Sequence, residues 1–355
     1  MTSVIAIMNQ KGGCGKTTTT INLSAALALK EKKVLTVDFD PQGHASLGLG
    51  ISEGIAGKTI AEVLLDKINI QDTVIKISEN HDLIPSNILL SSLELRLAGT
   101  SGREFYLKNH LKPLFDRYDF IIIDCPPQLG FLSVNAVMAA SHAVVPIEPS
   151  KFALDGAQQF FYTLNLLCEK ADHKVEIRHL VSMYDYESSF ATAFYEEMKK
   201  TFNTTLFQTP IRRSRHIQEA SCEGKSVLDY ESESLGYLDF MSLAHEVTLW
   251  VNRNTIMQIL NSAQNNPVIR EDGVYFITKA KDARSVQLAG SFNQWNPDRS
   301  YLQKITEDTW FTVLPLNKGT HFYKFVVDDK WTEDPNNPEK QTTLFGVTQS
   351  VVTVK

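Results

Sequence analysis

The sequence predicts an α/β chain, in which a doubly wound, mostly parallel sheet is followed by a small all-β sandwich. Two observations support this class. Up to about residue 253, short apolar runs alternate with segments of helical spacing, which is typical of parallel β-α-β units. From Gly273 onward, short alternating runs are separated only by turn residues such as Asn317-Lys318-Gly319, which favours strands without intervening helices.

The first part contains seven strand candidates. They are expected at 4–8, 33–37, 81–84, 120–123, 143–147, 175–183 and 205–206, with helical spacing over 105–117 and 153–171 among other segments. The run Ile121-Ile122-Ile123 is apolar at every position, which suits a strand covered by helices on both faces. In the second part, strands are expected at 274–279, 286–288, 310–314, 322–327 and 350–354.

The chain is expected to form two domains joined by a linker. Its 355 residues exceed the usual size of a single domain. Residues 254–267 are rich in Asn and Gln, hold few charges and end in Asn-Asn-Pro, which indicates a connecting segment. We therefore expect a first domain at 1–253, a linker at 254–269 and a second domain at 270–355.

The composition is that of an ordinary globular protein. No apolar run approaches the roughly 20 residues of a membrane span, and Met1 leads straight into the first predicted strand without room for a signal peptide. We therefore expect a cytoplasmic protein without a membrane partner. The cysteines contain no C-x-x-C pair, so neither a disulfide framework nor a zinc site is indicated; they are Cys14, Cys125, Cys168 and Cys222.

The charge is distributed unevenly along the chain. Residues 270–355 hold 11 basic and 11 acidic residues, so the whole net charge of −6 falls on the first part. Contact between that part and nucleic acid would therefore require a local basic patch.

Residues 11–18 read Lys-Gly-Gly-Cys-Gly-Lys-Thr-Thr and lie between the first predicted strand and a helical segment at 17–29. This is the context of a phosphate-binding loop, because glycines let the backbone approach a polyphosphate and the helix N-terminus attracts an anion. Lys16 would neutralise the β- and γ-phosphate oxygens, and the Thr17 hydroxyl would bind Mg²⁺. Gln10 replaces the glycine of the strict consensus, and Lys11 adds a second lysine.

Two acidic motifs follow predicted strands. Asp38-Phe39-Asp40 comes after the second strand, and Asp124-Cys125-Pro126-Pro127 follows the run at 120–123. A carboxylate at the carboxyl end of such a strand can hold Mg²⁺ directly or through water, and a second one can orient an attacking water. A lone motif of this kind is usually only a turn or a cap. In this order and context, the motifs predict a nucleotide site.

Together, these motifs resemble the ParA/Soj branch of the ParA/MinD ATPases, and the resemblance covers nearly all of 1–253. It implies a P-loop NTPase domain that uses ATP and Mg²⁺, forms a homodimer on binding ATP, and hydrolyses ATP slowly until a ParB-like or other partner stimulates it. Lys11 matches the lysine that reaches the partner's phosphates, and the resemblance implies catalytic roles for Lys11, Lys16 and Asp40.

The same resemblance assigns the remaining site residues. Thr17, Asp38 and Asp124 match the residues around the metal. Met183 and Pro210 lie where the family cradles adenine. The implied nucleotide-binding residues are Lys11, Gly12, Gly13, Cys14, Gly15, Lys16, Thr17, Thr18, Met183 and Pro210.

A basic segment near the end of the first domain leaves two interpretations open. ParA-like proteins bind DNA nonspecifically through basic residues in this region, where this chain has Arg212, Arg213 and Arg215. Close relatives commonly have arginine where this chain has Glu187, and often have another where it has His216. The segment is therefore either a DNA-binding surface, with association of the protein with the nucleoid, or a solvated face.

The second domain looks like the glycogen-binding module of the AMP-activated protein kinase beta subunit, within the family-48 carbohydrate-binding modules. Residues 286–297 and 319–335 carry the resemblance, which spans about 273–355. It implies an immunoglobulin-like (E-set) sandwich and an α-glucan ligand such as glycogen. Sugar sites need flat aromatic faces and hydrogen-bonding groups. The implied ligand positions are Trp295, Lys324, Trp331, Phe345 and Gln349, although kinase subunits have leucine and asparagine at the last two.

The sequence therefore predicts an ATP-dependent switch ATPase that positions or segregates a cargo, which is DNA or a protein or polysaccharide assembly. Its second domain would bind an α-glucan or dock a partner. Two alternatives stay open. One is a glucan-sensing regulatory ATPase that acts on carbohydrate metabolism. The other is an ordinary plasmid or chromosome partition ATPase whose second domain is a protein-interaction module.

Overall fold

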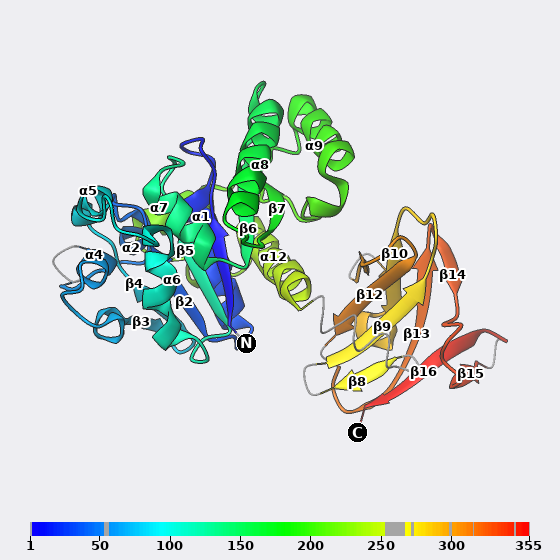
Figure 1. Cartoon of the computed structure of the whole chain (residues 1–355). Helices are drawn as coiled ribbons and strands as arrows, with labels where there is room; N and C mark the ends of the chain where they lie inside the picture. Colours follow the sequence, from blue (N-terminus) through cyan, green and yellow to red (C-terminus); the bar gives the residue numbers. More distant parts are fainter. Residues whose placement is uncertain are drawn as a thin grey trace. The chain divides into compact units, whose positions relative to one another are not determined.

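The computed structural model describes residues 2–52, 57–252, 267–270, 273–297, 300–314, 316–343 and 346–354. The chain divides into two compact units, Met1–Val251 and Asn252–Lys355 (Figure 1). Most of the predicted linker, residues 254–266, lies outside the described residues.

The first unit is built on a seven-stranded sheet of order β3-β4-β2-β5-β1-β6-β7. Neighbouring strands are parallel except β3, which runs antiparallel to β4. Residues 205–206, predicted as a strand, contribute only an isolated bridge between Leu206 and His179. The strands are β1 (Ser3–Ile7), β2 (Val34–Asp38), β3 (Ile75–Ser78), β4 (His81–Ile84), β5 (Phe120–Asp124), β6 (His142–Ile147) and β7 (Glu176–Val181).

Helices cover both faces of this sheet, so the predicted doubly wound fold is confirmed (Figure 1). Alternate residues of β1 enter two separate hydrophobic clusters, Val4 and Ala6 in one and Ile5 and Ile7 in the other. The helices are α1 (Lys16–Leu29), α2 (His44–Gly48), α4 (Ile60–Leu64), α5 (Leu93–Arg96), α6 (Tyr106–Leu111), α7 (Phe131–Ala139), α8 (Ala153–Lys170), α9 (Ser189–Phe202), α10 (Arg215–Cys222), α11 (Val227–Tyr230) and α12 (Leu235–Val251).

The predicted helical segment at 105–117 is shorter than expected. The α-helix α6 ends at Leu111, and a 3₁₀ turn, Lys112–Leu114, follows it. Pro113 lies within that turn, where its missing N–H and its ring prevent the α-helix from continuing.

The second unit is a sandwich of two antiparallel sheets, which confirms the all-β prediction. Side chains of both sheets, such as Phe276 and Phe325, form one buried core. The five-stranded sheet has the order β10-β13-β16-β15, with β14 paired to β13, and the four-stranded sheet has the order β11-β12-β9-β8. The strands are β8 (Val268–Arg270), β9 (Gly273–Lys279), β10 (Val286–Gly290), β11 (Gln303–Lys304), β12 (Thr309–Leu314), β13 (Gly319–Val327), β14 (Lys330–Thr332), β15 (Lys340–Thr342) and β16 (Thr348–Val354).

Candidate functional site

The glycine-rich loop connects β1 to α1 in a conformation that requires glycine. Gly13 and Gly15 have φ angles of 71° and 87°, which side-chain-bearing residues rarely adopt. A Cβ atom placed on Gly12 or Gly13 would meet nothing within 4 Å, so the space beside the loop is open. Gly15 is the N-cap of α1 and offers no side-chain cap, which leaves the first N–H groups of the helix available to an anion.

Lys16 and Thr17 open α1 and point to different parts of the site. The Lys16 side chain is only 7% exposed, and its Nζ donates to the Lys11 carbonyl oxygen at 3.1 Å. The Thr17 hydroxyl donates to Asp124 Oδ2 at 2.8 Å, and the Thr20 hydroxyl donates to Asp124 Oδ1 at 3.0 Å. The two hydroxyls of α1 therefore fix the carboxylate at the end of β5.

Asp38 and Asp124 end the adjacent strands β2 and β5 and are paired in register. Both are fully buried. Burial raises the pKa of each carboxyl group, and their mutual repulsion adds to the increase for Asp124. Ser46 holds Asp38 in place, because its backbone N–H and its hydroxyl both donate to Asp38 Oδ2 at 2.7 Å. Two buried carboxylates so close together favour a cation beside them.

Asp40 lies in the turn that follows β2. Its Oδ1 accepts a hydrogen bond from the Gln42 N–H at 3.0 Å, and its carbonyl oxygen accepts one from the Gly43 N–H at 3.0 Å. The side chain is buried. The segment from β2 to α2 therefore places Asp40 two residues beyond Asp38, in a tight turn whose conformation its own carboxylate stabilises.

The residues around the loop suit a magnesium ion that is shared with a ligand. Within the described ranges, no group of three or more His, Cys, Asp or Glu side chains could hold a metal. Mg²⁺ in phosphate sites is usually bound by one or two protein oxygens together with phosphates and water. The Thr17 hydroxyl, with Asp38 and Asp124 behind it, supplies such a donor set.

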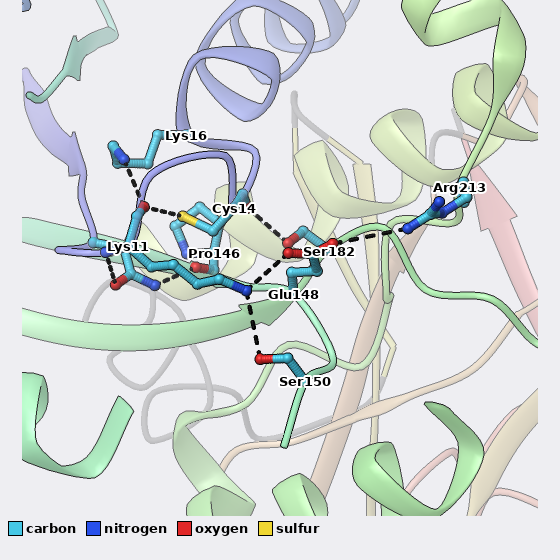
Figure 2. Close-up of polar contacts among 9 residues, drawn as sticks. Lys11, Cys14, Lys16, Pro146, Glu148, Ser150, Ser182 and Arg213 are labelled. Carbon is cyan, nitrogen blue, oxygen red and sulfur yellow. Dashed lines mark hydrogen bonds and ion pairs between the residues drawn. The ribbon is translucent and has the colours of Figure 1, made fainter. Parts of the chain in front are cut away.

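Lys11 projects from the loop and is held by residues that follow β6 (Figure 2). Its Nζ donates to Glu148 Oε2 at 2.9 Å and to Ser150 Oγ at 3.4 Å. The Lys11 side chain is 44% exposed and that of Glu148 is 26% exposed. Neither Glu148 nor Ser150 is among the residues predicted from the sequence. Their position just after a strand, at the carboxyl edge where ligands bind in such sheets, was the available signal.

The far end of the loop rests on residues after β7. The Ser182 hydroxyl donates to the Cys14 carbonyl oxygen at 2.7 Å (Figure 2). Burial raises the pKa of the Cys14 thiol, which keeps it neutral. A Cβ on Gly15 would lie 3.7 Å from Met183 Cε, so Met183 borders the loop.

Pro210, the second predicted adenine contact, lies near the end of β7. Its neighbour Ile211 donates its N–H to the Val181 carbonyl oxygen at 2.8 Å. The preceding residue Thr209 donates its N–H to the buried carboxylate of Glu246 at 2.8 Å. Met183 lies just beyond the edge strand β7, and the two hydrogen bonds fix the backbone on either side of Pro210 near the end of that strand.

The structure separates the three arginines of the basic segment. The Arg212 guanidinium donates from Nε to both carboxylate oxygens of the buried Asp239 at 3.0 Å, so its charge is paired with a buried carboxylate. Arg213 is 64% exposed and lies 3.8 Å from Glu148 Oε1 (Figure 2). Arg215 is exposed at the start of α10. Only Arg213 and Arg215 therefore present their charge to the outside.

Four of the five predicted sugar contacts lie in the described part of the second unit. The Trp295 and Trp331 rings have centroids 6.4 Å apart and planes 36° apart. Trp331 pairs with Val326 in the five-stranded sheet, and Lys324 is two residues from Val326 in β13. Trp331 and Lys324 therefore lie on the same outer face of that sheet. Gln349 alternates with the buried Ser350 in β16, which places it on the same face. Phe345 lies outside the described residues.

These geometries define a P-loop nucleotide-binding domain followed by a β-sandwich, and both parts match known families. Residues 2–177 match the family described as AAA domain, and residues 275–355 match the glycogen recognition site of AMP-activated protein kinase. The sporulation initiation inhibitor protein Soj of Bacillus subtilis (strain 168) is 40% identical over 250 residues, covering 70% of this chain and 98% of its own. The chain belongs to the ParA/Soj/MinD family of P-loop ATPases.

Solved structures show the same fold over the first unit. Cobyrinic acid a,c-diamide synthase from Mycobacterium smegmatis, with a bound ATP analog and magnesium, has a TM-score of 0.62 and 29% identity and covers 71% of this chain and 96% of its own. The septum site-determining protein MinD from Pyrococcus horikoshii, complexed with Mg-ADP, has a TM-score of 0.59 and 27% identity over 71% and 98% of the two chains. Among the described residues, no helix is long and apolar enough to cross a membrane.

Proposed function

We propose that this protein is an ATP-dependent switch ATPase that dimerises on binding ATP with Mg²⁺ and carries an α-glucan-binding module. The observation that supports the ATPase assignment best is the Thr17–Asp124 hydrogen bond beneath an open glycine loop, with buried Asp38 beside it. This arrangement places a phosphate-binding loop next to side-chain oxygens that can bind Mg²⁺. Relatives whose structures contain ADP or an ATP analog with magnesium share the fold.

In this proposal, each residue of the loop has a separate task. The N–H groups at the start of α1 and the Lys16 ammonium group bind the phosphates, after Lys16 leaves the Lys11 carbonyl oxygen. Bound Mg²⁺ would neutralise charge that develops on the phosphate oxygens. Thr17 and Asp124 would hold the metal side of the site, and Asp40 would orient the attacking water. Since none of these groups is an arginine, we expect slow hydrolysis that a partner stimulates.

Lys11 is the residue that we assign to dimerisation. In this structure its ammonium group is held by Glu148 and Ser150, two residues that follow β6 (Figure 2). Both the lysine and the glutamate are partly exposed, so the ion pair is weak enough to exchange. A second subunit carrying bound ATP would offer Lys11 a stronger, doubly charged partner.

The second unit would supply the contact with cargo. Trp295 and Trp331 form an aromatic pair on one face of the sandwich, with Lys324 on that face to donate hydrogen bonds to sugar hydroxyls. We propose an α-glucan such as glycogen as the ligand. The family match over residues 275–355 supports this assignment.

Nonspecific DNA is the second cargo that we propose to test. Arg213 and Arg215 are exposed, which favours contact with phosphates, whereas Glu187 lies exposed in the segment before α9 and opposes it. In the positioning proposal, ATP-dependent DNA binding is lost with Arg213→Glu. In the regulatory alternative, DNA binding is absent, and ATP changes only the binding of glucan or of a metabolic enzyme.

The dimerisation proposal is tested by light scattering after gel filtration, with and without ATP and Mg²⁺. We expect the wild-type chain to become a dimer only with both. Lys16→Ala should fail to bind ATP, and Lys11→Ala should bind ATP but remain monomeric. Lys225→Ala is a matched control. Lys225 is also an exposed lysine in an ion pair, with Glu223, but it is far from Lys11 in the sequence. A wild-type protein that binds ATP and stays monomeric would contradict the switch.

Glucan binding is tested by gel retardation in glycogen. We expect retardation of the wild-type protein and its loss in Trp295→Ala and Trp331→Ala. Ile269→Ala is the control, since Ile269 is an exposed apolar residue on β8 of the other sheet. Unchanged migration of the wild-type protein in glycogen would remove the glucan and leave a protein-docking module.

A further inference from the structure

The outer face of the five-stranded sheet carries one more exposed aromatic residue. Tyr301 is 56% exposed and forms an antiparallel bridge with Gln287 of β10. The next residue, Leu302, is buried in the core, and its N–H donates to the Val286 carbonyl oxygen at 2.8 Å. Because successive residues of an extended segment face opposite sides, Tyr301 faces away from the core.

Register places Tyr301 in one row with a predicted sugar contact. Gln287 pairs with Val326 of β13, and Val326 pairs with Trp331 of β14. Directly paired residues lie on the same face of a sheet. The row Tyr301, Gln287, Val326 and Trp331 therefore crosses the outer face, and three strand spacings separate its ends by about 14 Å.

The two end residues of this row are exposed, whereas the two middle ones are not. Gln287 and Val326 are buried, whereas Tyr301 and Trp331 are 56% and 47% exposed. Lys324, two residues from Val326 in the same strand, faces the same side and pairs with Ala289 of β10. Aromatic rings at both ends of the row, with Lys324 on the same face, suit a ligand with several C–H faces and hydroxyls.

We propose that Tyr301 is a further sugar-contacting residue, which extends the glucan site across β10 and makes it select α-linked oligosaccharides of several units over short ones. A single six-membered sugar ring is too small to reach from Trp331 to Tyr301, but a chain of linked rings spans the row. This inference rests on the proposed glucan binding. It adds a chain-length preference that the tryptophan pair alone does not provide.

The test compares maltotriose with maltoheptaose by calorimetry on the full-length protein. We expect Tyr301→Ala to weaken maltoheptaose binding about three- to tenfold, the value of one lost aromatic contact, and to change maltotriose binding less than twofold. Tyr301→Phe should keep most of the maltoheptaose affinity, because the ring face remains. Ile269→Ala, on the other sheet, should bind both sugars as the wild type does, and thermal melting of each variant reports its folding.

The outcomes separate this inference from the function on which it rests. If the wild-type protein binds neither sugar, the glucan proposal fails and this inference fails with it. If Trp331→Ala loses both sugars while Tyr301→Ala binds both normally, glucan binding stands and the role of Tyr301 is overturned. An equal loss of both sugars in Tyr301→Ala would also overturn it, because chain-length selection would then be absent.

Discussion

Replacing Glu148 with glutamine should make ATP-driven dimerisation easier. In the proposed switch, Lys11 must leave Glu148, whose carboxylate lies 2.9 Å from its ammonium group, before it reaches the partner's nucleotide. The pair is partly exposed, at 44% and 26%, so its contribution is that of a surface ion pair, about 0.5–1 kcal/mol. Two lysines are released for each dimer. The total of about 1–2 kcal/mol corresponds to a dimerisation constant about 5- to 30-fold larger in Glu148→Gln.

The assay is sedimentation equilibrium of wild-type and variant protein with Mg²⁺ and a slowly hydrolysed ATP analog. Glu196→Gln is the matched control, because it removes the charge of a comparable exposed pair, Glu196 with Lys199 at 2.8 Å on α9. It should leave the dimerisation constant unchanged. Higher ionic strength should reduce the difference between Glu148→Gln and wild type, since salt screens the pair. Equal or weaker dimerisation of Glu148→Gln would refute the view that Glu148 restrains Lys11.

Three further changes test other parts of the first unit. Ser46→Ala removes the hydroxyl that donates to Asp38 Oδ2 at 2.7 Å. It should lower the affinity for Mg²⁺ in the presence of nucleotide about tenfold, measured in a magnesium titration. Arg212→Ala leaves the buried Asp239 carboxylate without its cation, and it should lower the free energy of unfolding by about 3 kcal/mol, measured in urea. Any DNA binding should be unchanged in this variant, because the proposal assigns it to Arg213. Burial lowers the pKa of His179 to about 4, below its unfolded value, so His179 destabilises the fold as the pH falls from about 6.5 to 4. In that window, His179→Phe should therefore lose less free energy of unfolding on acidification than wild type, by about 1 kcal/mol per pH unit, measured by unfolding in urea at several pH values. An unchanged pH dependence would contradict this.

The sequence signals for the predicted nucleotide site are local. The glycines, Lys16 and Thr17 occupy one loop and the helix that follows it, and the two aspartates end apolar strands. Strands buried on both faces, such as β5, are also visible as unbroken apolar runs. The edge strand β3 was missed, because its residues alternate between half-buried and exposed.

Contacts between distant segments could not be read from the sequence. Glu148 meets Lys11 across 137 residues only because β6 lies beside β1 in the sheet. The fate of Arg212 likewise depends on Asp239, which α12 brings to it from 27 residues away. A run of arginines in sequence therefore did not distinguish an internal ion pair from an exposed charge.

Joining a dimerising ATPase to a glucan-binding module in one chain has a physical consequence under the proposed function. A polysaccharide particle presents many equivalent sugar chains. The dimer carries two glucan-binding modules, one from each subunit, so it can bind the same particle at two places. The second contact is intramolecular, and linking two modules in this way raises apparent affinity by about 10²- to 10⁴-fold where geometry permits both contacts. A monomer gains none of this. ATP binding at the glycine loop would thus control attachment to the polysaccharide through the number of modules that act together, without any change in the sugar site itself.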